Sequence, residues 1–84
     1  MSFFTVGEDE VRAWEIRVNT AAQKAAGKIH TDLERGFIRA EVVPYDDLIQ
    51  CRSLAESRKR GVLSQEGKDY IVKDGDIMHV LFNV

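Results

Sequence analysis

The chain has 84 residues, which is one small domain's length and leaves no room for a catalytic domain beside an accessory one. Its composition is 44% hydrophobic and 31% charged, so it can bury a modest core and is not a disordered tail. The formal net charge of -2 excludes nucleic-acid binding through bulk positive charge, so any such contact must come from a local basic patch.

The first predicted element is a β-hairpin, because apolar and β-branched residues alternate on both sides of a polar turn. It comprises a strand over residues 3–6, a turn over residues 7–10 (Gly-Glu-Asp-Glu) and a strand over residues 11–18. In the second strand Trp14, Ile16 and Val18 share one face, which we expect a following element to cover. On that face Trp14 is expected to pack in the core rather than to stack on a nucleic-acid base.

The covering element is predicted as one helix that starts at Thr20 and ends at Gly36. Its start matches a capping box, in which the side chains of Thr20 and Gln23 would bond to backbone amides of the first turn. Apolar residues recur at three-to-four spacing and form one stripe: Ala22, Ala25, Ala26, Ile29 and Leu33. His30 is expected to cap or pack near the helix end.

A third strand is predicted over residues 37–43 and ends at Pro44. Alternation places Ile38, Ala40 and Val42 on one face and Phe37, Arg39, Glu41 and Val43 on the other. Residues 46–60 have an interrupted helical pattern with a second capping box at residues 53–56, which predicts two short helices or turns. The last strands are predicted over residues 70–72 and 77–84, with a turn at Asp74-Gly75 between them.

This order of elements predicts one α+β domain over residues 1–84 with a β-grasp (ubiquitin-like) fold, in which a main helix packs on a mixed sheet and a short irregular helical insert follows. A ferredoxin-like fold is the main alternative. It would need a second full helix in the insert, and the broken pattern over residues 50–53 disfavours that.

Several long stretches carry a family resemblance. They are residues 3–7 (FFTVG), 10–14 (EVRAW), 29–42 (IHTDLERGFIRAEV), 66–79 (EGKDYIVKDGDIMH) and 82–84 (FNV). Together they closely resemble the C-terminal TGS domain of the YchF/Obg-like family of P-loop ATPases. The resemblance implies a chain taken from the C-terminal part of a longer protein that binds ATP or GTP with Mg and associates with ribosomes.

The chain itself is not expected to be an enzyme, because it lacks the Gly-x-x-x-x-Gly-Lys-Ser/Thr sequence that surrounds nucleotide phosphates. We therefore expect no cofactor in it. Cys51 and the two histidines do not have zinc-ligand spacing, so no metal site is expected either. No apolar run approaches the roughly 20 residues of a membrane span, which predicts a cytoplasmic protein without a membrane partner.

Two groups of residues are candidates for partner or RNA binding. If their strands lie on the same side of the sheet, alternation places one set of residues beside another on the uncovered face, and such a patch commonly marks an interface. The two sets are Phe37, Arg39 and Val43, and Ile77, His79 and Leu81. The alternative is that the helical insert or a neighbouring domain covers this face. The second group is the basic run Arg58, Lys59 and Arg60, for which the alternative is a solvated helix end.

Two functions follow from these candidates. The first is a non-catalytic binding or regulatory domain that assists association with the ribosome or RNA. The alternative is a module that docks on the NTPase and coiled-coil domains of its own protein and has no external ligand. RNA contact predicts an affinity that falls steeply with ionic strength, whereas apolar docking predicts little change with salt.

Overall fold

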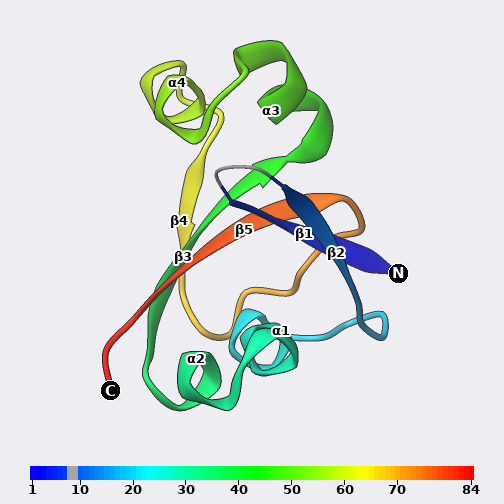
Figure 1. Cartoon of the computed structure of the whole chain (residues 1–84), viewed down its shortest axis with the longest axis vertical. Coiled ribbons are helices and arrows are strands. Elements are labelled where there is room, and N and C mark those ends of the chain that lie inside the picture. The colour runs from blue at the N-terminus through cyan, green and yellow to red at the C-terminus, as the bar shows by residue number, and fades with distance from the viewer. Residues whose placement is uncertain (8–9) are drawn as a thin grey trace.

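One mixed five-stranded sheet lies between two pairs of helices (Figure 1). The computed structural model describes residues 1–7 and 10–84. In chain order the elements are β1 (Ser2–Val6), β2 (Val11–Glu15), α1 (Ala22–Ile29), α2 (Thr31–Arg35), β3 (Phe37–Pro44), α3 (Tyr45–Cys51), α4 (Leu54–Lys59), β4 (Ser64–Glu66) and β5 (Asp76–Phe82). The strand order is β2-β1-β5-β3-β4, with β1 and β5 parallel and the other neighbours antiparallel. This arrangement confirms the β-grasp prediction, and the ferredoxin-like alternative is wrong.

The N-terminal hairpin has the predicted pairing, with Phe3 opposite Trp14. Part of its predicted turn, residues 8–9, lies outside the described residues. The second strand is shorter than predicted, because the chain turns away after Ile16 through Asn19, whose φ is 70°. Val18 therefore lies on the surface, 71% exposed, and its predicted place on the covered face is wrong.

The predicted single helix is two helices, α1 and α2, separated by His30. His30 has extended backbone angles, and its Nδ1 accepts a hydrogen bond of 3.0 Å from the Asp32 amide at the start of α2. This confirms the capping role expected for His30. Gly36 ends α2 as predicted. The apolar stripe runs on through the break, which explains why spacing alone predicted one helix.

The predicted capping box at the start of α1 is wrong. The Thr20 hydroxyl donates to the Arg17 carbonyl at 2.6 Å, and the Gln23 side-chain amide donates to the Glu34 carbonyl at 3.0 Å. Two amides of the first turn instead donate to the backbone carbonyls of Tyr70 and Lys68, at 2.7 and 3.1 Å. A neighbouring segment thus supplies the acceptors that side chains would provide at an isolated helix end.

Strand β3 contains a bulge that sequence alternation missed. Its register with β5 shifts between Phe37, which pairs with Phe82, and Arg39, which pairs with Leu81. The extra residue, Ile38, is 52% exposed, and Phe37 packs against the core beneath α1. The predicted place of Phe37 on the face of Arg39 is therefore wrong, because a bulge reverses the facing of the residues before it.

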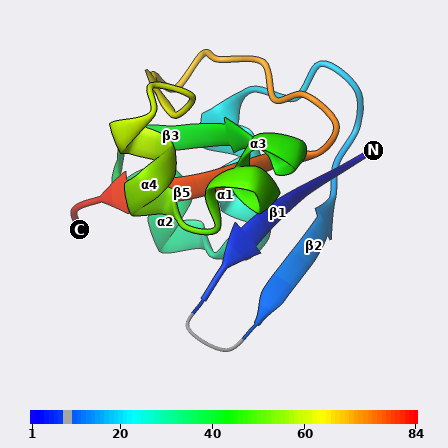
Figure 2. The same cartoon turned by 90° about the horizontal axis from the view of Figure 1, so that it is seen from above.

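The insert forms two short helices as predicted. The Ser53 hydroxyl caps α4 by accepting from the Glu56 amide at 3.0 Å. Arg52 joins the two helices with a φ of 73°. Helices α3 and α4 lie on the opposite side of the sheet from α1 and α2 (Figures 1 and 2).

The predicted strand over residues 70–72 is wrong, and β4 was not predicted. Ile71 makes only an isolated bridge to Ala21, while the Val72 amide donates to the Thr20 carbonyl at 3.0 Å. This segment therefore tethers the start of α1. Strand β4 is polar and short, so it lacks the apolar alternation on which strand prediction depends. The Asp74-Gly75 turn is confirmed, with Gly75 at a φ of 86°.

Two apolar clusters fill the two sides of the sheet. The cluster beneath α1 is Phe3, Ile16, Ala22, Ala25, Ala40, Val42, Val72 and Met78. Trp14 packs against it, partly buried, which confirms its predicted core side, and its Nε1 donates to Thr5 Oγ1 at 3.0 Å. The cluster beneath α3 and α4 has Val43, Leu48 and Ile77 at its centre.

Candidate functional site on the α3/α4 face

The candidate site lies on β3 and β5 where the cover of α3 and α4 ends. Val43 and its β5 partner Ile77 are fully buried beneath the insert. The insert thus covers part of this face, as the alternative interpretation anticipated. Further along the two strands, Glu41 pairs with His79 and then Arg39 with Leu81.

A buried carboxylate occupies the middle of this face. Glu41 is only 6% exposed, and Arg58 of α4 donates from Nη2 to both of its carboxylate oxygens, at 2.8 and 2.7 Å. Gln65 Nε2 donates to Oε2 at 2.9 Å, and His79 Nδ1 lies 3.1 Å from Oε1. Since a carboxylate only accepts hydrogen bonds, His79 Nδ1 carries the proton in this contact. We call these four residues the Glu41 cluster.

The Glu41 cluster keeps its carboxylate ionised. The hydrogen bonds from Arg58 lower the pKa of Glu41 to about 2, and those from His79 and Gln65 act in the same direction. Burial opposes them, because it penalises the charged form, but its effect is smaller. Glu41 is therefore negatively charged at neutral pH and holds one basic and two polar side chains at the edge of the open surface.

The sequence-predicted residues on this face have different environments. Arg39 is exposed, and its Nε donates to Gln65 Oε1 at 3.1 Å, which joins it to the Glu41 cluster. His79 is exposed, and Leu81 is partly buried. The structure thus brings Arg39, His79 and Leu81 together and excludes Phe37, which faces the other side.

The basic run does not act as one surface. Arg58 bonds to Glu41, and Arg60 Nε contacts Glu56 Oε1 at 3.2 Å. Within residues 1–7 and 10–84, Lys59 forms no salt bridge. Arg58 and Lys59 also lie in the last turn of α4, where cations meet the negative end of the helix dipole. Arg58 consequently has a structural role that sequence reasoning did not assign.

Glu41 and Gln65 are the residues that sequence reasoning missed. A signal for Glu41 was present, because it is a lone charge inside the apolar run Ala40 to Val43, and buried charges are normally paired. The position of Gln65 had no comparable signal, because β4 itself was not predicted.

This arrangement suits non-covalent binding. It offers hydrogen-bond donors and one apolar side chain, and the single cysteine, Cys51, is buried. In the described part of the chain, no group of three or more potential metal-ligating side chains is found. No helix in that part is long and apolar enough to cross a bilayer.

The strand order and the two helix pairs define a β-grasp domain with a polar open face. A family model named YchF-GTPase_C, described as "Protein of unknown function (DUF933)", matches residues 1–83. The chain therefore belongs to the YchF-GTPase_C family, the C-terminal domain of YchF/Obg-like ATPases, as the sequence resemblance predicted.

Relatives and a solved structure agree with this assignment. The chain is 55% identical over 83 residues to the "Ribosome-binding ATPase YchF" of Pasteurella multocida (strain Pm70), covering 99% of the chain and 23% of that protein. It is 56% identical over 81 residues to "Obg-like ATPase 1" of Caenorhabditis elegans, covering 96% and 20%. The "Structure of the Schizosaccharomyces pombe YchF GTPase" is 44% identical, with a TM-score of 0.87 over 95% of this chain and 21% of that one. The chain thus spans less than a quarter of these proteins.

Proposed function

We propose that the chain is a non-catalytic TGS domain that assists a YchF-like protein in associating with the ribosome or its RNA, in the cytoplasm. The names of its relatives support the partner, since several are called ribosome-binding ATPases. Binding of ATP or GTP with Mg belongs, in this proposal, to another domain of the longer protein, because these 84 residues contain no P-loop sequence.

The observation that carries the proposal is the juxtaposition of Arg39, His79 and Leu81 at the open end of β3 and β5. Gln65 orients the Arg39 guanidinium, and Glu41 orients the His79 ring. Arginine and histidine side chains can contact phosphate, and their planar groups can stack on unpaired RNA bases. Because they are already oriented, less conformational entropy is lost on binding.

Co-sedimentation of this 84-residue chain with ribosomes at low and high salt tests the proposal. The test variant changes Arg39, Lys59 and Arg60 to Ala and leaves Arg58 in place, because Arg58 holds the buried Glu41. The matched control removes three cations elsewhere on the surface: Arg35, Lys68 and Lys73 to Ala. We expect salt-sensitive pelleting that the control retains and that is weakened in the test variant, whose slope of log K against log salt should be shallower by about 2.

Equal pelleting of both triple variants would place the contact elsewhere on the domain. An absence of pelleting at either salt concentration would contradict autonomous ribosome binding by this chain.

The second candidate function is docking on the NTPase and coiled-coil domains of the same protein. Exposed apolar side chains at the open end of β3 and β5 favour it, namely Ile38 at 52% exposure and, on the α1 side of the sheet, Phe82 at 46%. Apolar contact predicts association that changes little with salt. Binding of the isolated NTPase and coiled-coil domains at high salt, lost in Phe82→Ser, would support this function over the first.

A further inference from the structure

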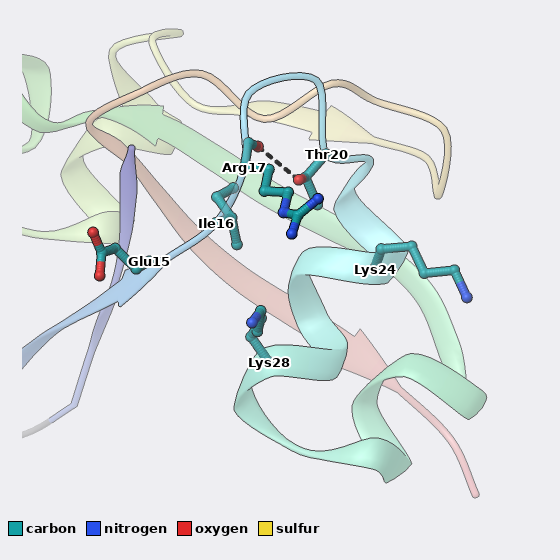
Figure 3. A pocket seen from close by; sticks show the side chains of 6 residues that line it. All are labelled: Glu15, Ile16, Arg17, Thr20, Lys24 and Lys28. Carbon is teal, nitrogen blue, oxygen red and sulfur yellow. Dashed lines mark hydrogen bonds between the residues drawn. The ribbon is translucent and has the colours of Figure 1, made fainter.

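A basic hollow lies on the other side of the sheet, between the loop that follows β2 and the helix α1 (Figure 3). Its volume is about 420 Å³. Six residues line it: Glu15, Ile16, Arg17, Thr20, Lys24 and Lys28. This volume falls within the roughly 300–1,000 Å³ typical of small-ligand pockets.

The wall formed by the loop is held in place by backbone hydrogen bonds. The amide of Ile16 donates to the Met1 carbonyl at 2.8 Å, and the Met1 amino group donates to the Ile16 carbonyl at 3.0 Å. At the other end of the loop, Thr20 is fixed twice: its hydroxyl donates to the Arg17 carbonyl, and its carbonyl accepts from the Val72 amide. The hollow is therefore formed before any ligand arrives.

Positive charge predominates in the hollow, although the chain as a whole has a net charge of -2. Three of the six lining residues are cationic and one, Glu15, is acidic. Lys24 Nζ bonds to Glu34 Oε2 at 2.8 Å, and its side chain extends away from the others in Figure 3. Arg17 and Lys28 form no salt bridge within the described part of the chain, so both remain available to an anion.

Other features of the hollow favour an anion that belongs to an organic molecule. Helix α1 has no acidic residue in its first turn that would neutralise these cations. Ile16 lines the hollow but is only 6% exposed, so it contributes a small apolar area to the floor. Guanidinium and ammonium groups are the usual protein ligands of phosphate.

We infer that this hollow binds a phosphate ester, with Arg17 and Lys28 as the cations that contact the phosphate. The phosphate ester can come from a free nucleotide or from an RNA strand. This inference goes beyond the proposed function, because the hollow lies on the α1 side and the Glu41 cluster on the α3/α4 side. An experiment can therefore refute one of the two binding proposals without refuting the other.

Amide chemical shifts of the ¹⁵N-labelled 84-residue chain test the inference. The chain is titrated with inorganic phosphate, AMP or a short single-stranded RNA, and a sodium chloride titration over the same range of ionic strength serves as the reference. The variants are Arg17→Ala and Lys28→Ala, and Arg35→Ala is the control because Arg35 lies on α2 and pairs with Asp32. Peak positions outside the hollow report whether each variant is folded.

We expect saturable shifts of Ile16, Arg17, Thr20 and Lys28 amides with the phosphate ligands. Affinity should fall at least about fivefold in Arg17→Ala and Lys28→Ala and stay unchanged in Arg35→Ala. Tighter binding of RNA than of AMP would identify RNA as the source, and the reverse would identify a nucleotide. Shifts that are absent, that chloride reproduces, or that survive in both folded variants would overturn the inference.

Discussion

The two faces of the sheet are stabilised by different interactions. Beneath α1 the core is mainly apolar, and small alanines let the helix approach the sheet closely. Beneath α3 and α4 the apolar cluster is smaller and borders the buried carboxylate of Glu41. The first face depends on packing. The second depends on a charged network whose donors also reach the surface.

The largest effect should come from the packed face. Phe3 is fully buried in the α1 cluster, so Phe3→Ala should lower the free energy of unfolding by about 3 to 5 kcal/mol. Urea unfolding followed by circular dichroism measures this change. Leu81→Ala, on the open face and only partly buried, is the matched control and should cost less than about 1.5 kcal/mol. Equal losses of unfolding free energy in Phe3→Ala and Leu81→Ala would contradict the difference between the two faces.

Arg58→Ala tests the charged network. It removes the main partner of a buried carboxylate and should cost about 2 kcal/mol, less than for a fully buried pair because the Arg58 side chain is 53% exposed. Lys59→Ala, one residue later, should change unfolding by less than about 0.5 kcal/mol. If the two variants unfold alike, the Arg58 contact does not stabilise Glu41.

The pH dependence of stability offers a third test. The pKa of Glu41 is lowered from 4.5 to about 2 in the folded chain, so its contribution is complete above pH 4.5 and is lost as the pH falls toward 2. We expect this loss to be about 1 to 2 kcal/mol, because solvent around Arg58 weakens the interaction. Urea unfolding of the native chain and of Glu41→Gln, at several pH values, measures it. The variant should lack this part of the acid sensitivity, and identical profiles would refute the assignment.

The smallest effect concerns the helix pair on the packed face. A methyl group on Gly27 would overlap with the Glu34 carboxylate, which is the flexible end of a side chain and would have to move aside. Gly27→Ala should therefore change stability by less than about 0.5 kcal/mol, since its helix-propensity gain is offset by displacement of Glu34 from Lys24. In a Glu34→Ala background the same change should stabilise by up to about 1 kcal/mol. If Gly27→Ala has the same effect on stability in both backgrounds, the overlap with Glu34 is contradicted.

Sequence reasoning succeeded where local pattern and tertiary packing agree. The hairpin and the insert helices follow from alternation, a Ser cap and turn residues. It failed where a neighbour decides the local structure. The tethering of residues 70–72 to α1 and the pairing of polar β4 with β3 depend on partners distant in sequence. The break at His30 is local, because its ring caps α2 through the Asp32 amide.

The same limit applies to the candidate site. Alternation put Arg39, His79 and Leu81 on one face, because the antiparallel register of β3 and β5 is regular there. It misplaced Phe37, because nothing in the local sequence marks the bulge at Ile38. It also treated Arg58 as a surface cation, since its partner Glu41 is 17 residues away.

The central position of β1 and β5 has a consequence for how the chain folds. The Ser2 amide bonds to Asp74 Oδ1, 72 residues away, and the Gly75 amide bonds to the Ser2 carbonyl. The middle of the sheet therefore joins the first strand of this domain to its last. Such distant pairing is slow to form, because the loop-closure entropy is lost before contacts compensate for it. During translation, the β1 edge of the hairpin should remain unpaired until residues 76–82 emerge. The sheet should form only then, when β5 pairs with β1.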